Sequence, residues 1–189
     1  MRKSFKIILV IFAVLIILFV SVAAIIFLDV AAYTATGSKT LTTIGTSAGK
    51  AIVIYDPGLS GTAKGVADKV ASDLQTKSYT VTLAGVKSSA AAKTTGYSVI
   101  VVGGPVYAGA LTSSIKGALE CLALNYDQGA KIGVFGSGQG ATSPDDIAMI
   151  KLSIPVRLDA TLQNAIIVKI GSSEDLSARA QDFVNQLVT

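Results

Sequence analysis

The chain has 189 residues, which gives room for one ordinary domain and one additional element. It contains no histidine and a single cysteine, which excludes Ser-His-Asp and Cys-His catalysis, an intrachain disulfide and a cysteine-rich metal site. The net charge of +4 arises mostly in residues 1–49, since the rest of the chain holds 12 basic and 11 acidic side chains, and a nearly neutral domain carries no electrostatic footprint for nucleic acid.

The first predicted element is a membrane anchor within residues 1–29. Residues 7–28 are apolar except for Ser21, and at about 1.5 Å per residue they are long enough to cross a bilayer core. The basic residues before this segment predict a cytoplasmic N-terminus and a domain outside the cell membrane. A cleaved signal peptide is the alternative, but its apolar region is usually about 7–15 residues long.

Residues 30–49 are dominated by Ala, Thr, Gly and Ser with little periodicity, which predicts a flexible linker. From residue 50 to 189, apolar segments rich in β-branched residues alternate with helical patterns. The predicted strands are Ala51–Tyr55, Tyr79–Leu83, Ser98–Gly103, Lys131–Gly136 and Ala165–Ile170. Five apolar strands interleaved with helices indicate an α/β domain with a doubly wound parallel sheet.

Helix start signals lie between these strands. We expect a helix over Thr62–Thr76, a second with Thr112 as N-cap, and a third that begins at Ser143-Pro144. The last helix is predicted from about residue 174, with Ser172 or Ser173 as its cap. Cys121 falls in the apolar pattern of the second helix, so we expect it to be buried.

In a doubly wound sheet, ligands bind outside the carboxyl ends of the strands, where loops 56–62, 104–111 and 137–143 should meet. The first loop lacks the Lys-Ser/Thr ending of a Walker loop and the spacing of a dinucleotide loop. Its Ser60 and Thr62 offer hydroxyls, and Gly61 lets the backbone approach a ligand, which favours a phosphate site at the helix N-terminus. An ordinary strand-to-helix turn is the alternative.

The second and third loops supply the other candidate cofactor-binding residues. Tyr107 offers a flat ring that could stack on a heterocycle, or it could simply pack against its neighbouring loop. The third loop is small and polar, typical either of backbone contact with a ligand or of a surface turn. The candidates in these two loops are Gly104, Pro105, Val106, Tyr107, Gly109, Gly136, Ser137, Gly138 and Gln139.

The three loops, in this order, resemble the flavodoxin family over residues 50–189. The family's first-loop pattern is matched by Tyr55, Ser60, Gly61, Thr62, Val66 and Ala67, and its second-loop pattern by Gly103-x-Pro105-x-Tyr107. The chain departs from the family in an extra residue near Pro57, in Ala63 where a hydroxyl is common, and in the absence of an aromatic residue from the third loop.

This resemblance implies an FMN cofactor, with its phosphate on Ser60, Gly61 and Thr62 and its ring between the second and third loops. It also implies electron transfer between redox partners, which the sequence does not identify. Together with the anchor predicted at residues 7–28, this gives a membrane-anchored electron carrier as the expected function. Two alternatives stay open. One is an FMN-dependent quinone or porphyrinogen reductase at the membrane, and the other is a binding module of the same fold that has lost FMN. No metal site is predicted.

Overall fold

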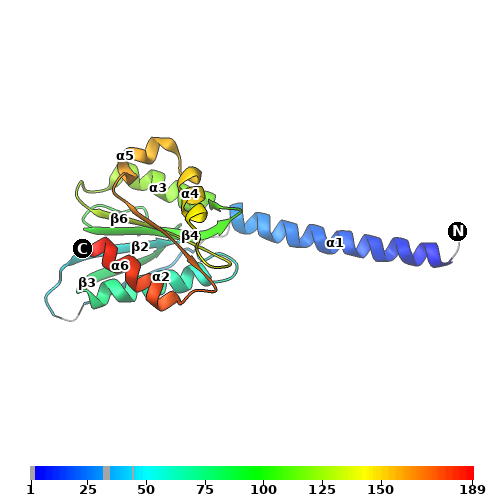
Figure 1. The fold of residues 1–189 in the computed structure, drawn as a ribbon, viewed down its shortest axis with the longest axis horizontal. Helices are drawn as coiled ribbons and strands as arrows, with labels where there is room; N and C mark the ends of the chain where they lie inside the picture. Colours follow the sequence, from blue (N-terminus) through cyan, green and yellow to red (C-terminus); the bar gives the residue numbers. More distant parts are fainter. Residues whose placement is uncertain (1–2, 32–34, 44) are drawn as a thin grey trace.

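The structure is a computed structural model that describes residues 3–31, 35–43 and 45–189. A long N-terminal helix is followed by an α/β domain (Figure 1). The helices are α1 (Lys3–Ala31), α2 (Thr62–Thr76), α3 (Ser113–Asn125), α4 (Pro144–Ser153), the 3-10 turn η1 (Val156–Leu158), α5 (Asp159–Leu162) and α6 (Leu176–Val188). The strands are β1 (Ser38–Leu41), β2 (Gly49–Tyr55), β3 (Tyr79–Gly85), β4 (Val99–Tyr107), β5 (Ala110–Leu111), β6 (Lys131–Gly138) and β7 (Ile166–Gly171).

The predicted doubly wound parallel sheet is confirmed. Its parallel strands lie in the order β3-β2-β4-β6-β7, so that the second strand of the set lies outside the first. Val53 of β2 is paired with Leu83 on one side and Val101 on the other. The order reverses at β2, and the loops that follow β2, β4 and β6 therefore leave the sheet side by side.

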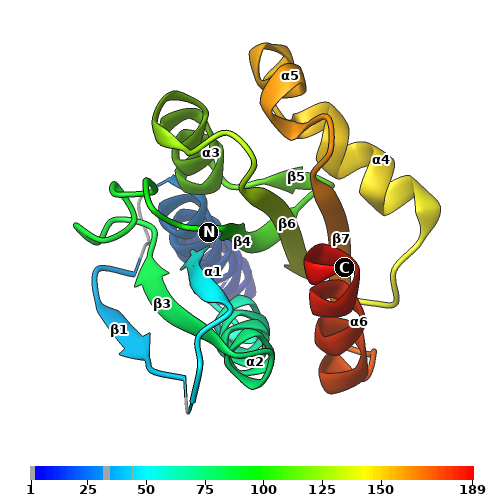
Figure 2. The ribbon, with the colours of Figure 1, turned by 90° about the vertical axis from the view of Figure 1, so that its left-hand side faces the viewer.

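Helices cover both faces of the sheet, as Figure 2 shows along the strands. On one face α2 and α6 pack over a core that includes Phe135 and Phe183. On the other face α3, α4 and α5 cover a second core that includes Ile100 and Ile115. Successive strand residues point to opposite faces, and burial on both faces explains why the central strands are apolar throughout.

The prediction of a flexible linker over residues 30–49 is wrong for part of that segment. Ser38–Leu41 forms β1, which pairs antiparallel with β3, from Ser38 opposite Ala84 to Leu41 opposite Val81. Two further backbone bonds precede it, from Gly85 N to Gly37 O at 2.8 Å and from Lys87 N to Ala35 O at 3.1 Å. The polar side chains of β1 are exposed, because an edge strand needs only its backbone to pair, and they carry no apolar periodicity that would reveal a strand.

Three local expectations are also corrected. The N-cap of α6 is Asp175, whose carboxylate accepts from Ser177 N and Ala178 N, and not Ser172 or Ser173. Cys121 is exposed, because it lies on the outer side of α3. The strand predicted to end at Gly103 continues to Tyr107 as β4 and turns back into β5.

Within α1, the segment Ile8–Ile26 has a mean hydropathy of 3.4, and none of it is buried against the rest of the structure. By length and composition it could cross a membrane. Figure 1 shows α1 leaving the domain at the end of the sheet toward which β4 points.

Candidate functional site

The three predicted loops leave the same edge of the sheet. Tyr55 at the end of β2 is paired with Gly103 of β4, and Gly104 of β4 is paired with Gly136 of β6. We call this the loop edge: residues 56–62 after β2, the turn at 108–109 after β4, and residues 139–143 after β6. The first loop also packs against the last part of β4, since a Cβ built on Gly58 would lie 3.0 Å from Pro105 Cγ.

The first loop ends at an accessible helix N-terminus. Gly61 is the N-cap of α2 with a left-handed φ of 71°, and a Cβ built on it would meet nothing within 4 Å. The Ser60 hydroxyl donates to Thr62 Oγ1 at 3.1 Å and accepts from Thr62 N at 3.3 Å. The first turn of α2 contains no acidic side chain. The positive end of the helix dipole and two hydroxyls therefore face an approaching anion without a competing carboxylate.

Asp56 shapes this loop, and sequence reasoning did not single it out as a site residue. Its side chain is buried, with 1% exposure, directly after β2. Oδ1 accepts from Gly58 N at 3.2 Å, and Oδ2 accepts from the hydroxyls of Thr112, at 3.2 Å, and Ser114. The carboxylate thus joins the first loop to the N-terminus of α3, where a negative charge is favourable. The feature of the sequence that could have indicated this role is an aspartate placed between an apolar strand and the Pro57-Gly58 turn.

Thr112 occupies the N-cap position of α3, as predicted, but its side chain makes no cap hydrogen bond to the helix. Its hydroxyl bonds the Asp56 carboxylate instead. Propensity identified the position correctly, and the tertiary contact changed what the side chain does there.

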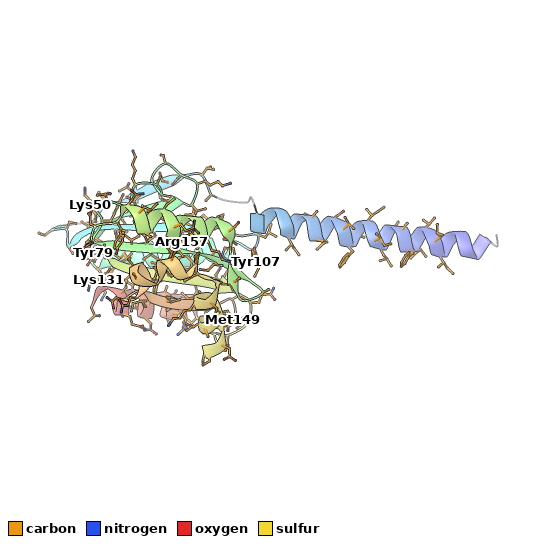
Figure 3. All side chains as sticks on the ribbon, turned by 90° about the horizontal axis from the view of Figure 1, so that it is seen from above. Lys50, Tyr79, Tyr107, Lys131, Met149 and Arg157 are labelled. Carbon is orange, nitrogen blue, oxygen red and sulfur yellow. The ribbon has the colours of Figure 1, made fainter. Side chains whose placement is uncertain are left out.

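The second predicted loop is a β-hairpin. β4 and β5 pair Val106 with Leu111 and Tyr107 with Ala110, and the turn between them has positive φ at Ala108 (49°) and Gly109 (80°). Positive φ at both central residues is the geometry of a two-residue hairpin. Tyr107 is half-buried, and strand alternation places it on the same face of the sheet as Pro105. Figure 3 shows Tyr107 at the end of the domain nearest α1.

The third loop is fixed at both ends. Ser172 N donates to Gly138 O at 2.8 Å, and the Thr142 hydroxyl lies 2.8 Å from Lys169 O and 2.7 Å from Glu174 Oε2. Burial by itself would raise the pKa of Glu174, but hydrogen bonds from Gly171 N and Thr142 outweigh it and lower the pKa.

An ion pair lies below the third loop. Lys169, only 6% exposed, places its ammonium 2.9 Å from Asp146 Oδ2. The pKa of Asp146 is lowered to about 2, first by Lys169 and then by the N–H and hydroxyl of Ser143. Ser143 and Asp146 form a capping box with Pro144 in the first turn, which confirms the predicted start of α4.

No protein-family model matches the chain, and no curated protein matches it. Among solved structures, it is similar to oxidised Flavodoxin 1 from Bacillus cereus, with 15% identity and a TM-score of 0.52 over 74% of this chain and 97% of that one. A flavodoxin from the domain Archaea gives 15% identity and a TM-score of 0.50 over 74% and 99%. The strand order found here is also that of flavodoxin.

The chain has a flavodoxin-like fold. The same fold occurs within rubredoxin:oxygen oxidoreductase from Desulfovibrio gigas, at 15% identity and a TM-score of 0.52. This match covers 75% of the present chain, which spans only 36% of that oxidoreductase.

The flavodoxin-like fold places the predicted site residues in two groups. Ser60, Gly61 and Gln139 are exposed at the loop edge, and Thr62 and Gly109 are half-buried there. Val106, Tyr107 and Gly138, at the strand ends next to it, are also half-buried. Gly104, Pro105, Gly136 and Ser137 are buried within the strands. A Cβ on Gly136 would lie 2.4 Å from Val106 Cγ2, and one on Gly104 would lie 2.8 Å from Ile115 Cγ1. These two glycines therefore serve close packing beneath the loop edge, a role that sequence alone did not separate from ligand contact.

Proposed function

We propose that this protein is a membrane-anchored electron carrier that binds FMN at the loop edge. The main support is the start of α2, where the N-cap Gly61 is open to its surroundings and is flanked by the hydroxyls of Ser60 and Thr62. This donor set fits a terminal phosphate, and it lies on the same edge of a flavodoxin-like sheet as Tyr107.

The predicted site residues that are not buried within the strands divide into two roles in this proposal. Ser60, Thr62 and the first-turn N–H groups of α2 hold the phosphate. The β4–β5 turn and residues 138–139 line the two sides of the ring, with Tyr107 on or beside it. When bound, FMN supplies the redox chemistry, and the protein positions it and limits its contact with water. Burial of the Asp56 hydrogen bonds keeps the first loop in the shape that presents its donors.

The cofactor is tested directly by the absorption spectrum of the purified full-length chain and by adding FMN while thermal unfolding is followed. A yellow protein with a flavin spectrum, or a midpoint that rises with FMN concentration, supports the proposal, because a ligand bound only by the native state stabilises it. A colourless protein whose midpoint does not respond to FMN contradicts it and leaves the binding-module alternative.

The phosphate site is tested with a matched pair of variants on one helix. Thr62→Val removes a proposed phosphate ligand at the start of α2, and Thr76→Val removes an exposed hydroxyl at its end that donates to Ser72 O. A hydrogen bond to a charged group contributes about 1.5–3 kcal/mol, so Thr62→Val should weaken FMN binding about tenfold or more. Equal FMN affinities for the two variants would place the phosphate elsewhere.

The membrane part of the proposal rests on Ile8–Ile26 and on the basic residues before it. We place the N-terminus in the cytoplasm and the domain outside, by the positive-inside rule. Protease added to intact cells should then degrade the domain, whereas degradation only after lysis would indicate the reverse orientation. A chain recovered without residues 1–29 would instead indicate a cleaved signal peptide.

A further inference from the structure

The connection between α1 and the domain is short and enters at the loop edge. α1 ends at Ala31, and Ala35 already lies against the carboxyl end of β3, where its carbonyl accepts from Lys87 N at 3.1 Å. A Cβ on Gly85 would come within 2.4 Å of Ala35, so the chain here is packed onto the sheet. Because β1 is paired with the sheet, the free connection between α1 and the domain is much shorter than a linker over residues 30–49 would have been.

The maximum length of this connection can be compared with the diameter of the domain. Four Cα steps join Ala31 to Ala35, and at about 3.6 Å each they reach at most about 15 Å. A domain of about 150 residues is about 35–40 Å across. A free linker of about 20 residues would have a root-mean-square span of about 25 Å and a far longer maximum. The connection is too short for the opposite edge of the sheet to turn toward the end of α1.

We propose that the loop edge faces the bilayer surface, so that its redox partner must reach it from within the membrane plane. This inference rests on the proposal above that α1 is a membrane anchor. In Figure 3, Tyr107 lies at the end of the domain from which α1 leaves, whereas Lys50, Tyr79 and Lys131 lie at the far end. In Figure 2, which looks along the strands, α1 extends behind the domain.

Two apolar side chains at this end are compatible with a lipid surface. Leu59 in the first loop is 50% exposed, and Met149 of α4, which packs beside Gly109 of the hairpin turn, is 47% exposed. Both would lie near the headgroups, where partial burial of apolar surface is favourable.

The orientation is measured on the full-length chain in vesicles, in a Cys121→Ser background that removes the exposed native thiol. Single cysteines are introduced by Leu59→Cys at the loop edge and Lys131→Cys at the opposite edge, both exposed positions. Each is labelled with a fluorophore, and quenching by phospholipids that carry a headgroup nitroxide is compared. We expect strong quenching at residue 59 and little at residue 131.

An insertion variant tests whether the short connection between α1 and the domain sets the orientation. Ten Gly/Ser residues inserted after residue 34 should reduce quenching at residue 59 toward the value at residue 131. Equal quenching at the two sites without the insertion, or no effect of the insertion, overturns the proposal. The quenching measurement needs no FMN. A domain that is oriented as expected but binds no flavin would therefore refute the electron-carrier function and leave the orientation proposal intact. Sedimentation of the vesicles separates a misoriented domain from a chain that is not anchored, and an unanchored chain overturns both.

Discussion

Replacement of Asp56 tests whether one buried carboxylate holds the first loop and α3 together. Asp56→Ala removes the acceptor for Gly58 N and for the hydroxyls of Thr112 and Ser114. Hydrogen bonds to a charged group contribute about 1.5–3 kcal/mol each, and a buried group left without a partner costs about 1–3 kcal/mol. The two hydroxyls lie 2.9 Å apart and can bond each other, which limits the loss. We therefore expect about 3–4 kcal/mol of destabilisation.

Asp56→Asn separates the effect of the hydrogen-bond geometry from the effect of the negative charge, because asparagine keeps the size and shape of the side chain and removes its charge. The amide oxygen can still accept from Gly58 N, and the amide group can donate to a hydroxyl that rotates to accept. We expect a loss of about 1 kcal/mol. Asp127→Ala is the matched control, because Asp127 also accepts from a backbone N–H, that of Gly96 at 2.7 Å, but it is exposed. This change should cost less than about 1 kcal/mol.

The assay is thermal unfolding of the full-length chain in detergent, followed by circular dichroism. For a domain of this size, 1 kcal/mol shifts the midpoint by about 2–4 °C, so Asp56→Ala should lower it by about 6–16 °C and Asp56→Asn by about 2–4 °C. If Asp56→Ala is no more harmful than Asp127→Ala, the buried carboxylate does not organise the loop. If Asn is as harmful as Ala, the negative charge at α3 matters more than the hydrogen-bond geometry.

Two further predictions concern the structure beneath the loop edge. Because the folded pKa of Asp146, about 2, is below its ordinary 3.8, its contribution to stability is present above about pH 4 and is lost as the pH falls toward 2. Asp146→Asn should reduce the pH dependence of the unfolding midpoint in that window. It should also lower the midpoint at pH 7, because the buried Lys169 loses its counter-ion. An unchanged pH dependence would contradict the ion pair. Gly136→Ala should destabilise by about 1–3 kcal/mol, since its Cβ would press on Val106, whereas Gly117→Ala, at an open site within α3, should stabilise by up to about 1 kcal/mol. Similar midpoints for the two alanine variants would show that the strands can move apart at Gly136.

The main elements and the fold class followed from the sequence alone, because local patterns encode them. Apolar β-branched segments buried on both faces leave few alternatives to parallel strands, and the Ser143-Pro144 start of α4 carries its own capping chemistry. The order of the loops along the chain was enough to place them at one edge, because parallel strands have their carboxyl ends on the same side. The hydroxyls of Ser60 and Thr62 on either side of Gly61 were visible as well, because the three residues are adjacent in the chain.

The tertiary structure decided what local patterns leave open. Ser38–Leu41 becomes a strand only because β3 offers an unpaired edge, and this contact sets the short tether between α1 and the loop edge. Asp56 acquires its role only when α3 brings the hydroxyls of Thr112 and Ser114 to it from a distant part of the chain. Gly104 and Gly136 look like loop glycines in the sequence, yet the packing of Ile115 and Val106 against them makes them structural. Each of these depends on contacts between residues distant in the chain, which no local periodicity or propensity records.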